Sequence, residues 1–174
     1  MDYKASLDPL SKGISAGVIV LFAVIGFFTI QQLVQALHTD SSSWAYIISL
    51  VLLVSILGVT FCISPRGYIL TRNRLIIKRI FSDRLIFVKD IKQARLLQPD
   101  EMKGTIRTFG SGGLFGYFGK FYNNHLGIFT AYMTQRKNKI LIRLYSGEDI
   151  IVTPDDMYFL EDLQKQLQPR PELI

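Results

Sequence analysis

The stretch that most constrains this chain is an uncharged apolar run, WAYIISLVLLVSILGVTFCI, at residues 44–63. Its 20 residues, coiled as a helix, match the hydrocarbon thickness of a bilayer. A core helix of a small soluble domain is usually shorter and polar on one face. The run therefore predicts a membrane-spanning helix, and the alternative is a wholly buried helix of a soluble domain.

A second uncharged run precedes it at residues 14–37, with glutamines only near its far end. We expect a first membrane helix there, so that residues 14–63 form a helical hairpin with spans at 14–37 and 44–63. A cleaved signal peptide is the alternative for the first run. Even then, the second run would stop transfer and the domain after it would stay inside.

The distribution of positive charge predicts the orientation of the hairpin. Lys4 and Lys12 precede the first run and Arg66 follows the second, whereas the serine-rich connector at 38–43 has no Lys or Arg. Positive residues gather on the cytoplasmic side of membrane spans. We therefore expect residues 1–13, both termini and the C-terminal domain in the cytoplasm.

The chain beyond the hairpin is divided in charge. Residues 66–139 hold 15 Lys or Arg and four Asp or Glu, whereas residues 140–174 hold three and seven. A basic surface next to a bilayer favours anionic lipid headgroups. The same charge would suit nucleic acid, but no nucleic-acid motif accompanies it, so we expect no nucleic-acid partner.

Cysteine and histidine usage gives no sign of a metal or redox site. Cys62 is the only cysteine and cannot form an intramolecular disulfide, and no Cys/His cluster has metal-ligand spacing. We therefore expect no metal and no cofactor. His125 with Asp100 or Glu101 is the best material for an enzyme, but no nucleophile–base motif fixes these groups together. The sequence favours a protein without catalytic residues.

From Arg66 onward the pattern changes to short runs rich in β-branched and aromatic residues. Strands are expected at residues 68–71, 74–79, 84–87, 92–97, 127–134, 139–145 and 149–152. Turns are predicted at Arg72-Asn73 and at Ser146-Gly147. A series of strands closed by one helix indicates an α+β, mainly β domain.

The closing helix has a start signal and an apolar stripe. Thr153 is the predicted N-cap, Pro154 the first helical residue, and two prolines after residue 168 end the helix. The stripe consists of Met157, Leu160, Leu163 and Leu167. Residues 66–168 are expected to fold alone, and Thr153→Ala to cost about 1 kcal/mol through loss of the cap.

Residues 107–122 are too apolar for a solvated loop and too glycine-rich for a regular strand or helix, so they predict a partly ordered excursion. The spacing fits neither a P-loop nor G-x-G-x-x-G. The structural glycines are Gly110, Gly112, Gly113, Gly116 and Gly119.

Two interpretations of these residues remain. In one, the glycines set sharp bends while the aromatic residues Phe109, Phe115, Phe118 and Phe121 fill the core. In the other, side chains of the stretch face the bilayer, a partner or a second copy of the chain. Its candidates are Phe115, Tyr117 and Phe118, assisted by Arg107 and Lys120.

Three segments in order resemble the bacterial pleckstrin-homology-like domain family. They are SPRGYILTRNRLIIKR at 64–79, the glycine and aromatic pattern of 107–132, and TPDD at 153–156 followed by Phe159 and Leu163. The resemblance covers about residues 64–168. It implies a seven-stranded, strongly bent antiparallel barrel or sandwich capped by a C-terminal helix. With its two-helix leader, the chain is similar to a membrane-anchored member, which implies the bacterial inner membrane, with residues 169–174 as a tail.

The resemblance implies a fold and no catalytic residue. Eukaryotic pleckstrin-homology domains often bind phosphoinositides through a basic first hairpin. Here that hairpin carries Arg72, Arg74, Lys78 and Arg79 without a clear K-x-n-[KR]-x-R spacing. These four cations complete the candidate interaction or lipid-facing residues.

The leading functional hypothesis is a membrane-anchored, non-enzymatic interaction module. Its cytoplasmic domain would bind a protein partner, another copy of itself or anionic lipid headgroups. The alternatives are an accessory subunit of a transporter or other membrane complex, recognised through the helical hairpin, and an enzyme.

Overall fold

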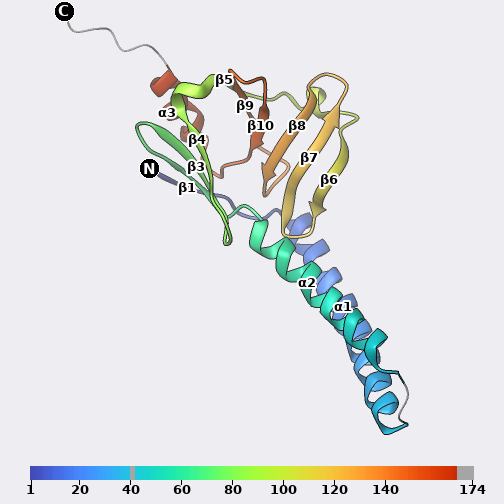
Figure 1. Ribbon diagram of the computed structural model, residues 1–174. Coiled ribbons are helices and arrows are strands. Elements are labelled where there is room, and N and C mark those ends of the chain that lie inside the picture. Colours follow the sequence, from blue (N-terminus) through green and yellow to red (C-terminus); the bar gives the residue numbers. More distant parts are fainter. Residues whose placement is uncertain (40–41, 168–174) are drawn as a thin grey trace, which may run out of the picture.

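The computed structural model describes residues 1–39 and 42–167 (Figure 1). Two long helices, α1 (Pro9–His38) and α2 (Trp44–Ile63), form a hairpin that projects from a β-rich domain. The domain ends in a third helix, α3 (Tyr158–Leu167). This confirms the expected fold class, two apolar helices followed by a mainly β domain with a closing helix. The predicted tail at 169–174 lies outside the described residues.

The two long helices are long and apolar enough to cross a membrane. Helix α2 has the predicted bounds, but α1 begins at Pro9, earlier than expected. Asp8 caps it, because its carboxylate accepts a hydrogen bond from the Ser11 N–H at 2.7 Å. No described residue of α2 is buried. Helix α2 packs along α1, and the apolar exposure of its remaining surface is typical of a helix in contact with lipid.

The described strands form two sheets. The four-stranded sheet has the order β1-β2-β3-β4 and is antiparallel throughout. Its strands are β1 (Asp2–Lys4), β2 (Gly67–Leu70), β3 (Arg74–Lys78) and β4 (Arg84–Phe87). The predicted turn at Arg72-Asn73 joins β2 to β3, and a short 3₁₀ turn (Val88–Asp90) leads into the second sheet.

The six-stranded sheet has the order β5-β9-β10-β8-β7-β6. Its strands are β5 (Ile91–Leu96), β6 (Ile106–Gly113), β7 (Gly116–Asn123), β8 (Gly127–Met133), β9 (Ile140–Leu144) and β10 (Asp149–Val152). All seven strands expected from the sequence are present, and β1, β6 and β7 are additional. The pair β8 and β10 is parallel, which differs from the all-antiparallel expectation.

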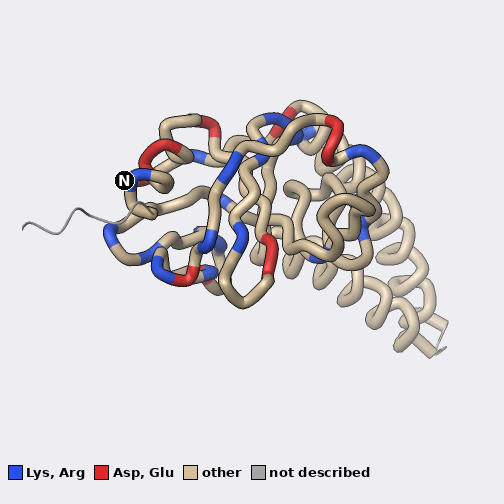
Figure 2. Tube along the Cα trace, turned by 90° about the horizontal axis from the view of Figure 1, so that it is seen from above, with Lys and Arg blue, Asp and Glu red and all other residues tan. Residues whose placement is uncertain are grey.

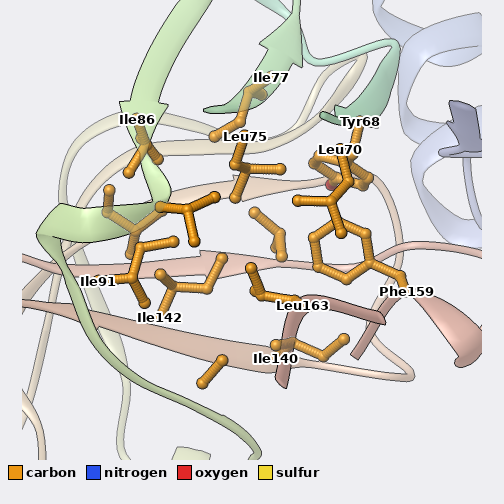
Figure 3. Close-up of a cluster of buried hydrophobic side chains, with 14 of the residues drawn as sticks. Tyr68, Leu70, Leu75, Ile77, Ile86, Ile91, Ile140, Ile142, Phe159 and Leu163 are labelled. Carbon is orange, nitrogen blue, oxygen red and sulfur yellow. The ribbon is translucent and has the colours of Figure 1, made fainter. Parts of the chain in front are cut away.

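The two sheets pack face to face around the main core, with α3 closing one end (Figure 3). Tyr68, Leu75 and Ile77 of the first sheet lie opposite Ile140 and Ile142 of the second, beside Phe159 and Leu163 of α3. All are buried. The leucine stripe thus has the expected role, because Leu163 is buried and Leu160 and Leu167 pack against this cluster.

Strand β1 ties the N-terminus into the domain. Tyr3 packs edge-on against Phe159, with ring centroids 5.2 Å apart, and its hydroxyl donates to Asp162 at 2.6 Å. Burial and the Asp162 carboxylate raise the pKa of the Tyr3 hydroxyl. A fragment of residues 66–168 would lack this strand. Because β1 precedes α1 and pairs with β2 after α2, both ends of the helix hairpin return to one sheet.

The predicted capping role of Thr153 is wrong. Helix α3 begins at Tyr158, and the Asp156 carboxylate accepts from the Tyr158 N–H at 2.9 Å. Thr153 is buried instead, and its hydroxyl accepts from the Thr134 N–H at 3.0 Å. The Thr153 hydroxyl therefore accepts a tertiary hydrogen bond and does not cap the helix, because the buried Thr134 N–H needs an acceptor.

The predicted excursion at 107–122 is also wrong, because these residues form the hairpin of β6 and β7. Gly110 and Gly119 pair across it with φ of 110° and 112°. A Cβ on Gly110 would lie 2.8 Å from the Gly119 Cα. Only glycine accepts both this conformation and this close approach, so here glycine makes a strand pair possible.

Candidate interaction surfaces

The tip of the β6–β7 hairpin rests on α1. The Ser11 hydroxyl donates to the Gly113 carbonyl at 2.6 Å, and the Phe115 N–H donates to the Ser15 hydroxyl at 2.8 Å. A Cβ on Gly113 would lie 2.6 Å from the Ile14 Cδ1, so glycine lets α1 approach the tip closely. Ser11 and Ser15 are buried, which explains two polar residues at the start of an apolar helix.

The aromatic residues of this hairpin have different environments. Phe115 contacts α2, with its ring edge-on to Phe61 at 5.2 Å. Tyr117 and Phe118 are buried, which leaves Phe115 as the one of the three aromatic candidates for the second interpretation that is not buried. Phe121 is buried as the first interpretation required, whereas Phe109 is 77% exposed. The first interpretation therefore holds for Phe118 and Phe121 but not for Phe109.

A second turn of the domain reaches the end of α2. The N–H groups of Ile80 and Phe81 donate to the Cys62 carbonyl at 3.1 and 3.2 Å. This turn joins β3 to β4 and extends toward the helices (Figure 1). Phe81 is 83% exposed. This contact was not predicted from the sequence, although Ile80 and Phe81 are apolar residues at a hairpin turn, where polar residues are usual.

The segment before α1 supplies a further attachment. The Asp8 carboxylate accepts from the Arg136 Nε at 3.0 Å and from the Tyr117 hydroxyl at 3.3 Å. Burial and nearby Asp8 raise the pKa of the Tyr117 hydroxyl. The Asp8 N–H donates to the Thr134 carbonyl at 3.1 Å. Both ends of the helix hairpin that face the domain are therefore fixed to it.

The four cations of the first hairpin do not form one patch. Arg72 and Arg74 lie at one end of β3, and Lys78 and Arg79 lie at the other. The second end adjoins the turn that bonds Cys62, whereas the first points away from the helix hairpin (Figure 1). The two pairs of cations, although close in the sequence, are thus separated by the length of β3.

The other two candidate cations belong to the second sheet. Lys120 donates to the Thr130 hydroxyl at 2.7 Å and lies 4.0 Å from the Glu148 carboxylate. Arg107 is exposed and lies over Gly112, where a Cβ would be 3.0 Å from its Nη1. Lys120 is therefore engaged within the domain, and Arg107 fills the space that Gly112 leaves.

A groove of about 660 Å³ lies at the end of the domain far from the helices. We call it the distal groove; it is lined by Arg72, Asn73, Arg74, Phe87, Val88, Lys89, Ile91, Tyr145, Gln166 and Leu167. Arg74 and Lys89 lie 5.2 and 5.6 Å from the centre of the Phe87 ring. No acidic side chain is among these lining residues, so the surface suits a negatively charged partner.

A second concave surface, of about 430 Å³, lies beside the end of α2. We call it the basic pocket; it is lined by Asp2, Tyr3, Lys4, Arg66, Gly67, Lys78, Arg79 and Ile80. Figure 2 shows the charged residues over the β domain, while the helix hairpin is uncharged over nearly all its length. The basic pocket therefore lies where the charged and uncharged parts of the molecule meet.

The two carboxylates considered for catalysis are held in other interactions. The Glu101 carboxylate accepts from both Nη atoms of Arg95, at 2.6 and 2.9 Å, and from the Gln98 N–H. Hydrogen bonds from Arg95 lower the pKa of Glu101 to about 2, so this carboxylate is a poor proton acceptor at neutral pH. Asp100 pairs with Lys103 at 2.6 Å. Among the described residues, no group of His, Cys, Asp and Glu is arranged to hold a metal ion.

Comparisons with known proteins bear on the β domain. Residues 66–168 match the family described as bacterial PH domain. A search of curated proteins and a search of solved structures found no match. The matched range runs from the start of β2 to the end of α3, and it excludes β1 and both long helices. The matched range covers more than half of the sequence, and the chain therefore belongs to the bacterial PH domain family.

Proposed function

We propose that this chain is a membrane-anchored, non-enzymatic interaction module whose PH domain presents its distal groove to a protein partner. The supporting observation is the fixed attachment of the domain to the helix hairpin through Ser15, Cys62 and Asp8. This attachment holds the distal groove on the side away from the helices (Figure 1). A fixed orientation suits a surface that meets its partner at a set height above a membrane.

Insertion of the hairpin into a bilayer supports this arrangement. No described residue of α2 is buried, and lipid is the solvent that matches its exposed apolar side chains. Both ends of the hairpin return to the same sheet, so the domain and the N-terminus lie on one side of the membrane. With Lys4, Lys12 and Arg66 on that side and no Lys or Arg in the connector, that side is the cytoplasm of a bacterium.

The chemistry of the distal groove indicates the partner. Arg72, Arg74 and Lys89 offer positive charge, and the rings of Phe87 and Tyr145 offer apolar contact. An acidic protein segment that carries an apolar side chain would satisfy both. The groove lies at the end of the domain opposite the helices, so a protein reaches it more readily than a lipid of the same bilayer does.

The second candidate function is an accessory subunit of a transporter or other membrane complex. The exposed side of α2 favours it, because the helix surface that faces away from α1 is free to pack against another membrane protein. The two functions differ in which surface meets the partner.

Site-specific photo-cross-linking in cells separates the two. A photoreactive amino acid in place of Tyr145, which lies in the distal groove, is expected to capture one protein of defined mass. Arg72→Glu with Arg74→Glu should abolish the adduct. Tyr158, on α3 outside the groove and similarly exposed, is the matched control position. Adducts from Val51 on α2 but none from Tyr145 would contradict the module and favour the accessory subunit.

A further inference from the structure

The basic pocket adjoins an apolar groove on α2. The groove, of about 500 Å³, is lined by Val54, Ser55, Gly58, Val59, Cys62, Ile63 and Phe81. We propose that the basic pocket and this apolar groove together bind one anionic phospholipid, with its phosphate in the pocket and an acyl chain in the groove. The proposal rests on the membrane insertion proposed above, and it does not involve the distal groove.

The basic pocket lies where the first sheet has a glycine between two lysines on neighbouring strands. Lys4 pairs with Gly67 on β2, and Gly67 pairs with Lys78 on β3. Paired residues of antiparallel strands share a face, so the two lysines stand on either side of a residue that has no side chain. Arg66 and Arg79 border the same gap. Four cations thus line the pocket, and the Asp2 carboxylate also reaches it, because its Oδ1 would lie 3.9 Å from a Cβ on Gly67.

The charge of the pocket is largely uncompensated. Asp2 is its one acidic lining residue, and it approaches Lys78 only to 3.9 Å. Within residues 1–39 and 42–167, Lys4, Arg66 and Arg79 make no ion pair. The Arg79 Nε is buried and has no acceptor among the described residues. The Arg79 guanidinium lies 5.7 Å from the centre of the Tyr132 ring, but a ring supplies no acceptor for the Nε–H. A buried donor without an acceptor is costly, and a phosphate oxygen would supply one.

The groove on α2 has the opposite chemistry. Its floor is the helix surface at Gly58, where a Cβ would meet nothing within 4 Å, and Phe81 borders it. The bonds from the turn to the Cys62 carbonyl hold Phe81 beside the helix, although its side chain is 83% exposed. In water this arrangement would be unfavourable. In a bilayer it forms an apolar channel open to acyl chains.

The position of the basic pocket next to the apolar groove indicates that the occupant is a phospholipid. Ile80 lines the pocket and Phe81, the next residue, lines the groove. The basic pocket and the apolar groove therefore meet at the turn between β3 and β4. The pocket lies at the end of α2 where Arg66 follows, which is the headgroup level of an inserted helix. An anionic headgroup above an acyl chain matches this arrangement, and basic side chains at that level favour anionic lipids.

Native mass spectrometry of the full chain in mild detergent tests the proposal. The probe is an equal mixture of phosphatidylglycerol and phosphatidylcholine with identical acyl chains. We expect the wild-type chain to retain one phosphatidylglycerol preferentially. The variant Lys4→Gln/Lys78→Gln/Arg79→Gln should retain it at least about tenfold less, because it removes three of the four cations that line the pocket.

The matched control removes the same charge elsewhere. Arg72→Gln/Arg74→Gln/Lys89→Gln lies in the distal groove and should leave lipid retention unchanged. Equal losses in the two triple variants would mean non-specific attraction and would overturn the proposal. Equal retention of the two lipids by the wild-type chain would also overturn it. Unfolding temperatures of both variants check that each protein is folded.

Two further experiments distinguish a bound phospholipid from a second copy of the chain and from free phosphate. Phe81→Ser should weaken retention of long-chain phosphatidylglycerol and spare a short-chain form. If it instead dissociates a dimer while lipid retention is unchanged, the groove is an interface between copies. Inorganic phosphate at millimolar concentration should not displace the lipid; displacement would assign the pocket to free phosphate. Loss of the Tyr145 adduct with lipid retention intact would sink the proposed partner surface alone.

Discussion

The Ser15 hydroxyl accepts a hydrogen bond from the Phe115 N–H at 2.8 Å, 100 residues further along the chain. Ser15 lies on α1, and Phe115 lies at the tip of the glycine-rich hairpin. The same hydroxyl donates to the Ser11 carbonyl at 2.7 Å. It therefore links the backbone of α1 to the backbone of the hairpin tip by two hydrogen bonds. This bond joins the apolar helix hairpin to the PH domain.

Removing this hydroxyl should loosen the hairpin tip. Ser15→Ala leaves the part-buried Phe115 N–H without its acceptor, at a cost of about 1–2 kcal/mol. Hydrogen exchange of the purified full chain should show about tenfold faster exchange at the hairpin tip, residues 113–116. Thr29→Ala is the control, because the Thr29 hydroxyl bonds only within α1, to the Ile25 carbonyl. Equal exchange in both variants would show that the bond does not hold the tip.

The glycine pair of the hairpin makes a strong prediction. Gly110→Ala places a Cβ against the Gly119 Cα and forces a φ of 110° on a residue with a side chain. We expect a loss of about 3–5 kcal/mol from strain and overlap together. Gly127→Ala is the control, because its φ is 74° but a Cβ there meets nothing within 4 Å. It should cost only about 1 kcal/mol.

Thermal unfolding in detergent, followed by circular dichroism, measures both glycine variants. About 1 kcal/mol lowers the melting temperature of a chain of this size by roughly 2–4 °C. A similar melting temperature for the two variants would mean that the close approach of the strands does not matter.

A buried hydrogen-bond network centred on Tyr68 makes the third prediction. The Tyr68 hydroxyl donates to the Tyr132 carbonyl at 2.6 Å and accepts from the Thr153 N–H at 3.1 Å. Tyr68→Phe removes both of these buried bonds and should cost about 2–3 kcal/mol. Tyr158→Phe, at a 66% exposed position, is the control and should change stability little.

The same residue gives a pH dependence. Burial raises the pKa of Tyr68 from 10.0 to about 12, so the folded chain keeps a proton that the unfolded chain releases. This contribution is complete below pH 10 and is lost between pH 10 and about 12. Between pH 10 and about 12, the unfolding free energy of the wild type should therefore fall faster than that of Tyr68→Phe. The difference between the two slopes should be about 1.4 kcal/mol per pH unit. Parallel curves would contradict a buried, protonated Tyr68.

The topology proposed for the hairpin is tested by labelling of introduced cysteines. The background carries Cys62→Ser, and single cysteines replace Ser42 in the connector or Ser146 in the turn between β9 and β10. A membrane-impermeant reagent should label position 42 in intact cells and position 146 only after the cells are opened. The reverse pattern would place the PH domain outside the cytoplasm.

The fold was predictable where local patterns decide it. The bounds of α2 follow from hydropathy, and the seven expected strands follow from alternation and turn residues such as Ser146-Gly147. Strand β1 was missed because three residues are too few for a pattern. The β6–β7 hairpin was missed because glycine usually weakens a strand, and the pairing of Gly110 with Gly119 that reverses this effect is a tertiary contact.

The candidate residues were predictable only in part, for a related reason. Arg72 and Lys78 are close in sequence, but β3 carries them to opposite ends of the sheet. Thr153 follows a common capping pattern, yet its hydroxyl is used by the Thr134 N–H. The attachment of Phe81 to the end of α2 depends on how the domain sits on the helices, which no local pattern encodes.

The bonds at Ser15, Cys62 and Asp8 should hold the helix hairpin and the PH domain together as one rigid unit. This rigidity is tested most directly by the distance distribution between spin labels at Val54 on α2 and Tyr145 in the distal groove, both exposed. The background carries Cys62→Ser, in lipid nanodiscs. We predict a single narrow distribution that broadens when Ser11→Ala and Ser15→Ala are combined. A broad distribution in the chain that retains both serines would contradict the rigid unit.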